Sequence, residues 1–140
     1  RTEAEERRRL LSAAMFPLVF AALHHVEHVI RGTHVGWPVI AEVTPFTFSL
    51  VVYPILLLGM LLTARGAARA GYWLFVGVLG LGIVGWSHGP QSDEQVAGIY
   101  YFYADRIWGV VSVGILALTL IGLVNLLITA LRIRASSGRW

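Results

Sequence analysis

The chain has 140 residues, of which 56% are hydrophobic and only 14% are charged. Soluble domains average about half apolar and a quarter charged residues, so this balance is typical of an integral membrane protein. Cysteine is absent, which excludes disulfide frameworks, thiolate metal sites and cysteine nucleophiles. The net charge of +3 comes from arginine, since the chain has no lysine, and these arginines do not form a nucleic-acid-binding face.

Apolar stretches long enough for a membrane-spanning helix, which needs roughly 20 residues to cross about 30 Å of hydrocarbon, follow one another along the chain. The four expected spans cover residues 10–30, 45–64, 71–88 and 105–131. Polar or glycine-containing segments end each of them. The sequence therefore predicts one all-α transmembrane domain over residues 1–140, an integral membrane four-helix bundle with up-down-up-down topology.

The arginines between the spans predict the orientation, because positively charged flanks stay in the cytoplasm. With both termini cytoplasmic, nine arginines share that side: Arg1, Arg7, Arg8, Arg9, Arg65, Arg69, Arg132, Arg134 and Arg139. The opposite side then carries Arg31 and Arg106 together with the acidic residues Glu42, Asp93, Glu94 and Asp105. We therefore expect a multi-pass protein of the cell membrane whose termini are both cytoplasmic.

The histidines gather at the expected exoplasmic end of the bundle. They are His24, His25, His28, His34 and His88. At about 100° per residue, one face of the first span carries His24, Glu27, His28 and Arg31, whereas His25 lies at the edge of this face. His88 closes the third span at a comparable depth, so it can meet this face across the bundle. Ionisable side chains inside a span are costly and are functional by default.

Residues 24–28 also fit the order H-x-x-E-H, in which two histidines bind zinc and the glutamate is a general base. The match is one of local geometry, since the proteins with that motif are large and soluble. We predict an exoplasmic transition-metal site formed by His24, His28 and His88, with Glu27 as a fourth ligand or as a catalytic base. Such ligands suit zinc, iron, copper or manganese. An open coordination position would permit hydrolysis or redox chemistry.

A b-type haem is the second hypothesis. His28 and His88 would then be the axial ligands, and Arg31 and Arg106 would bind the propionates. Haem held between membrane helices would make the protein an electron carrier or a quinone-linked oxidoreductase subunit. The carboxylate of Glu27 beside an anionic porphyrin edge speaks against this arrangement.

Two sets of residues fit more than one interpretation. The face of the third span that carries His88 also carries Gly77, Gly80 and Gly85. These glycines leave room either for a flat ligand or for a closely packed neighbouring helix. The outer loop and the first residues of the fourth span contain Tyr100, Tyr101, Tyr103 and Trp108. Their aromatic side chains form either an interfacial belt or a lid over the site.

The third hypothesis is a structural or accessory subunit. A small protein with four spans and short loops can pack against a larger membrane complex or form a homo-oligomer, and its histidines would then bind partners or pigment. Transport is less well supported, because few polar residues continue across the inner halves of the spans beyond Asn125.

Overall fold

The computed structural model describes residues 2–31, 45–90 and 95–137 as a set of helices. These are α1 (Glu3–Arg31), α2 (Pro45–Ser49), α3 (Val52–Ala64), α4 (Ala70–Ser87), α5 (Val96–Phe102) and α6 (Arg106–Ser137). The described part of the chain contains no strand, so the all-α class is confirmed. Several residues named above lie outside the described residues, namely Arg1, His34, Glu42, Asp93, Glu94 and Arg139.

Four segments are long and apolar enough to cross a membrane, as predicted. They are Glu3–Arg31, Phe46–Ala64, Ala70–Ser87 and Arg106–Ser136. Their outward surfaces carry large apolar side chains, such as Val78 at 62% and Leu57 at 55% exposure, as expected for contact with lipid.

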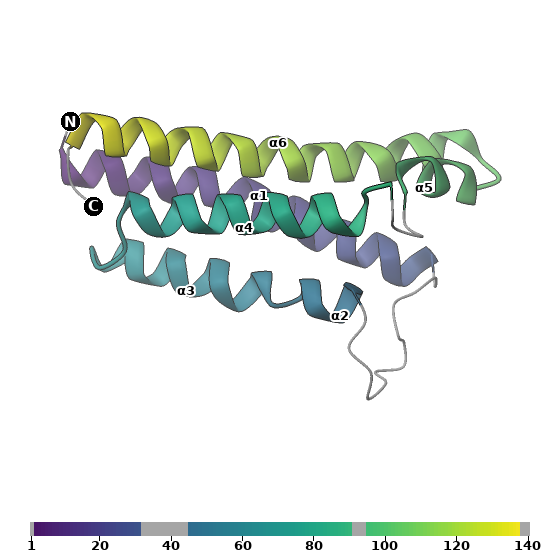
Figure 1. Cartoon of the computed structure of the whole chain (residues 1–140), viewed down its shortest axis with the longest axis horizontal. Coiled ribbons are helices and arrows are strands. Elements are labelled where there is room, and N and C mark those ends of the chain that lie inside the picture. The colour runs from purple at the N-terminus through teal and green to yellow at the C-terminus, as the bar shows by residue number, and fades with distance from the viewer. Residues whose placement is uncertain (1, 32–44, 91–94, 138–140) are drawn as a thin grey trace.

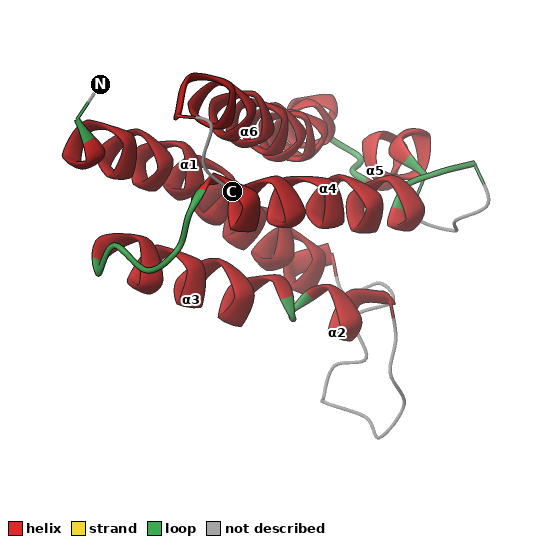
Figure 2. Cartoon of the chain, turned by 60° about the vertical axis from the view of Figure 1, so that its left-hand side comes forward, coloured by secondary structure: helices red, strands yellow, loops and turns green. Residues whose placement is uncertain are grey.

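The long helices lie side by side along the length of the molecule (Figure 1). α1 and α4 both pack along α6, and α3 contacts α1 and α4. Figures 1 and 2 show that α1 begins and α6 ends at the same end of the molecule, which we call the terminal end. α2, α5 and the last turns of α1 and α4 lie at the opposite end, which we call the site end.

A buried hydrophobic cluster joins α1, α3, α4 and α6. Its members are Leu10, Ala13, Ala14, Leu56, Ala70, Trp73, Val76, Leu126, Ala130 and Ile133. Trp73 is fully buried, and its indole N–H donates to Thr63 Oγ1 at 2.8 Å. The Tyr72 hydroxyl donates to the carbonyl oxygen of Ile55 at 2.6 Å. These two hydrogen bonds fix α3 against α4 and leave neither aromatic donor unpaired.

Glycines in α4 allow close packing against α6. A Cβ atom at Gly80 would lie 2.7 Å from Leu123 Cδ2, and one at Gly77 would lie 3.2 Å from Leu127 Cβ. Leucines from α6 thus fill the space beside these two glycines, which supports the packing interpretation over room for a flat ligand. A Cβ atom at Gly85, which lies nearer the site end, would have no such neighbour within 4 Å.

The second span is broken rather than continuous, which the sequence did not predict. Helical structure stops at Leu50 and Val51 between α2 and α3. Pro54 lacks an N–H, and its ring excludes the carbonyl group four residues earlier, that of Leu50. The N–H of Tyr53 bonds this carbonyl oxygen at 3.2 Å in a tighter turn. Pro17, by contrast, lies inside the unbroken helix α1.

Candidate metal centre

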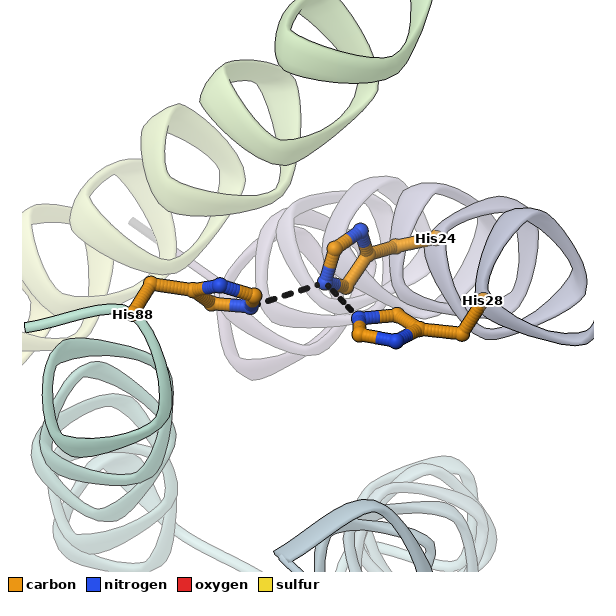
Figure 3. A group of neighbouring side chains, drawn as sticks. All are labelled: His24, His28 and His88. Atoms are coloured by element: carbon orange, nitrogen blue, oxygen red, sulfur yellow. Dashed lines mark hydrogen bonds between the residues drawn. The ribbon is translucent and has the colours of Figure 1, made fainter. Parts of the chain in front are cut away.

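Three histidines from two helices meet at the site end of the bundle (Figure 3). His24 and His28 lie one turn apart on α1, and His88 follows the last residue of α4. His24 Nε2 lies 3.0 Å from His88 Nε2 and 3.2 Å from His28 Nε2. One ligand atom from each residue lies within 4.8 Å of the other two. We call these three residues the histidine cluster; its proximity agrees with the prediction from helical spacing and depth.

Two of the three ligand separations in the histidine cluster suit a shared metal ion. Metal to imidazole bonds are about 2.0–2.1 Å, so two nitrogen ligands of a tetrahedral ion lie about 3.3 Å apart. The two short separations in the cluster are close to this value. His24 and His28 are buried, at 6% and 7% exposure, so an ion held here would be shielded from water on the α1 side. Imidazole ligands suit zinc, copper and iron alike.

As a hydrogen-bond network, the histidine cluster is poorly satisfied. A terminal nitrogen of Arg31 lies 3.2 Å from His28 Nδ1. Because a guanidinium can only donate, Nδ1 accepts, and a neutral His28 then carries its proton on Nε2, directed at His24 Nε2. His24 Nε2 has one lone pair but two imidazole neighbours, the second being His88. A cation resolves this conflict, because all three lone pairs can then point at one centre.

The other ring nitrogen of His24 adds to the cost of this arrangement. Its Nδ1 is buried and has no hydrogen-bond partner among the residues that the structure describes. When Nε2 accepts a hydrogen bond, a neutral His24 carries its proton on Nδ1. A buried donor left unsatisfied costs about 1–3 kcal/mol. Burial of the histidine cluster in this arrangement therefore lowers the stability of the fold.

Glu27 and Arg31 form a buried ion pair beside the histidine cluster. Arg31 Nε lies 2.8 Å from Glu27 Oε1, and a terminal nitrogen of Arg31 lies 3.2 Å from Glu27 Oε2. The Tyr103 hydroxyl donates to Glu27 Oε1 at 2.9 Å. Burial raises the pKa of Tyr103, so its phenol remains a donor. Glu27 shares the helix face of the ligands but does not belong to the group of converging ligand atoms.

His25 lies apart from the histidine cluster, at the broken second span. Its Nδ1 lies 2.6 Å from the Tyr53 hydroxyl oxygen and 2.9 Å from the carbonyl oxygen of Ala21. Its Nε2 lies 2.7 Å from Ser49 Oγ. The sequence placed His25 at the edge of the polar face but gave no sign of these partners. Through them, His25 joins α1 to α2 and α3.

The aromatic residues around the start of α6 fall into two groups. Tyr101 and Trp108 are 79% and 59% exposed, as in an interfacial belt. Tyr103 instead reaches Glu27, and the Phe102 ring centroid lies 5.9 Å from the guanidinium carbon of Arg31. The short helix α5, which the sequence did not predict, thus places two aromatic side chains against the ion pair.

Arg106 occupies the first position of α6 and is exposed. Asp105 Oδ1 accepts the N–H of Ile107 at 2.8 Å, so this acid caps the helix. Arg31, the other arginine considered for haem propionates, is bound by Glu27. These contacts give the haem arrangement no support.

The position of His24 also favours a bare ion over a haem. The proposed axial ligands His28 and His88 both lie close to His24 Nε2, at 3.2 and 3.0 Å. An iron ligated by both would need about 2 Å to each nitrogen, with a porphyrin plane between them. The third imidazole stands in that space, whereas it is a ready ligand for a bare ion.

Comparisons with models of protein families, with curated proteins and with solved structures find no match for this chain. The feature that a function of this protein has to explain is the convergence of three imidazoles at one end of a bundle of apolar helices.

Proposed function

We propose that this multi-pass membrane protein binds a transition-metal ion, zinc, iron or copper, through His24, His28 and His88. The observation that carries the proposal is the convergence of one ligand atom from each histidine within 4.8 Å. Two ligands come from α1 and the third from the end of α4, so a bound ion would tie the two helices together. Metal binding would then also stabilise the folded bundle.

We further propose that the bundle runs up-down-up-down with both termini in the cytoplasm and the metal site near the exoplasmic surface. The described arginines outside the site end support this orientation. They are Arg7, Arg8, Arg9, Arg65, Arg69, Arg132 and Arg134. Arginine-rich flanks are retained in the cytoplasm, so the end that carries them is the cytoplasmic one.

Three imidazoles leave a coordination position for water or a substrate, which is the arrangement of catalytic rather than structural metal sites. A zinc ion held in this way would supply a hydroxide near neutral pH, whereas iron or copper would supply redox chemistry. Glu27 is the nearby carboxylate, but its two oxygens already accept from Arg31 and Tyr103. Its contacts support a positioning role, in which it holds Arg31 beside His28.

Loading the site requires a change of proton position on His28. Ligation needs the lone pair of Nε2, so the proton must move to Nδ1. A protonated Nδ1 no longer accepts from Arg31, which lies 3.2 Å away. Glu27 can retain Arg31 when this contact is lost, because it holds the guanidinium by two nitrogens. The ion pair thus keeps the buried guanidinium of Arg31 paired when His28 exchanges its contact with Arg31 for a metal ion.

Elemental analysis of detergent-purified protein without a polyhistidine tag tests the proposal. We expect near-stoichiometric metal in the wild type and its loss in His28→Ala and in His88→Ala. His25→Gln is the matched control, because it changes a neighbouring histidine outside the cluster and keeps an amide that can hydrogen bond. Circular dichroism of each variant verifies that the helices persist. Absence of metal from the wild type after incubation with zinc, iron and copper would refute the proposal, as would equal loss in His25→Gln.

A further inference from the structure

A second polar site lies toward the terminal end, in a cavity of about 420 Å³ between α1 and α6. Its charged lining consists of Arg8 and Arg9 from α1 and Arg132 from α6. Pockets for small ligands typically measure about 300–1,000 Å³, so the volume suffices for a headgroup-sized ligand. The residues that line it are distinct from those of the histidine cluster.

The arginines lie at one end of the cavity, and Phe16 and Asn125 lie toward the other. Phe16 follows Arg8 by eight positions, which is about 12 Å along α1. Arg132 follows Asn125 by seven positions, or about 10 Å along α6. Because α1 begins and α6 ends at the terminal end, the arginines share that end and Phe16 lies deeper in the span. A ligand that matches this lining has an anionic head and an apolar body.

The charge of the cavity indicates that the polar head of its ligand is anionic. Its three arginines are exposed and form no ion pair within the described part of the chain, and no carboxylate lines the cavity. Guanidinium groups bind phosphate oxygens by paired hydrogen bonds. Thr129 and the exposed Asn125 add polar groups on α6. Polar side chains on the outside of a span are costly unless a ligand or partner satisfies them.

The apolar surroundings of the cavity indicate that the rest of its ligand is apolar. Phe16 is 38% exposed, and its neighbours Met15 and Val19 on α1 are 47% and 45% exposed. These side chains continue the apolar surface of Phe16 onto the outward surface of the span. Basic pockets between membrane helices at the cytoplasmic side bind anionic lipid headgroups. We propose that this cavity binds an anionic phospholipid, with its phosphate among Arg8, Arg9 and Arg132 and its acyl chains along Phe16.

Native mass spectrometry of the detergent-solubilised full chain tests the proposal by titration with phosphatidylglycerol and with phosphatidylcholine. The test variant is the double exchange Arg9→Gln and Arg132→Gln. The control is Arg65→Gln with Arg69→Gln, which removes the same charge from exposed arginines outside the cavity. Each arginine that contacts the headgroup contributes about five-fold, so we expect roughly 30-fold weaker phosphatidylglycerol binding in the test variant. The control changes no residue of the cavity lining, so we expect a much smaller effect there.

Three results would overturn the proposal. Equal weakening in both variants would show that net charge, and not the cavity, attracts the lipid. Equal affinity of the wild type for phosphatidylcholine would show that the arginines do not select the anionic head. Displacement of phosphatidylglycerol by an equal concentration of inorganic phosphate would identify the free anion as the ligand. Metal content, measured on the same samples, separates this outcome from that of the histidine cluster.

Discussion

Gly122 lies where α6 crosses α1, and its exchange for alanine tests whether this crossing sets the position of the histidine cluster. A Cβ atom there would lie 2.8 Å from Phe16 Cδ1, 3.0 Å from Pro17 N and 3.1 Å from Pro17 Cα. The Phe16 ring can rotate, but the main chain of Pro17 cannot, so α1 must move away from α6. Overpacking of this kind costs about 1–3 kcal/mol.

Gly114→Ala is the matched control for Gly122→Ala. Both glycines lie inside α6, but nothing lies within 4 Å of a Cβ atom at Gly114. Alanine gains about 0.5–1 kcal/mol over glycine in a helix, and this gain is common to both exchanges. We therefore expect the Gly122→Ala variant to be less stable than the Gly114→Ala variant by about 1–3 kcal/mol. Reversible unfolding in mixed detergent micelles, followed by circular dichroism, measures the difference.

The same variants connect packing to the metal site. Pro17 precedes His24 by seven positions on α1, and α6 also supports α4, which carries His88. A shift of α1 against α6 therefore changes the separation of the ligands, and we expect Gly122→Ala to retain less metal than Gly114→Ala. Equal stability of the two variants would show that α6 and α1 do not approach each other closely at Gly122. Lower stability with unchanged metal content would show that the crossing does not position the cluster.

Three further predictions concern protons and hydrogen bonds. Metal retention should fall with acidification below about pH 6.5, the ordinary histidine pKa, because protons compete for the ligand nitrogens, and tight binding moves this loss to lower pH. Retention unchanged down to about pH 4 in a dialysis series would contradict histidine ligation. Tyr103→Phe removes a hydrogen bond to the buried carboxylate of Glu27 and should lower the unfolding free energy by about 1.5 kcal/mol, whereas an unchanged value would show that the bond contributes nothing. Thr63→Val keeps the side-chain shape but leaves the buried indole N–H of Trp73 without its acceptor. We therefore expect the free energy of unfolding to fall by about 1–3 kcal/mol in the same assay. Stability equal to the wild type would rule out this bond.

Local properties of the sequence predicted the spans and the meeting of the three histidines. Length and apolar content define a span without reference to its neighbours. His24 and His28 share a helix face by their spacing alone, and His88 joins them because it ends another span at the same depth. The break in the second span beside Pro54 was not predicted, because a proline by itself does not specify whether a helix continues, bends or breaks.

Contacts that depend on the rotation of one helix against another escaped prediction. The spans carry apolar residues on nearly every side, so their sequences do not show which face turns inward. The hydrogen bond between Tyr103 and Glu27 joins residues 76 positions apart and depends on the placement of α5. The partners of His25 likewise depend on where the break after Ser49 turns the chain. Neither spacing nor composition encodes these choices.

The buried polar face of α1 is easier to explain by function than by stability. A charged residue within a membrane span costs about 2.5–3.5 kcal/mol at the centre of the bilayer, and less toward the surface, where this face lies. Well-packed apolar side chains often stabilise a core as much as a buried ion pair does, or more. The last turns of α1 nevertheless bury His24, Glu27, His28 and Arg31 together. Leucine at these positions would pack better. A ligand whose binding offsets the cost of burying the imidazoles therefore explains this face more simply than stability does.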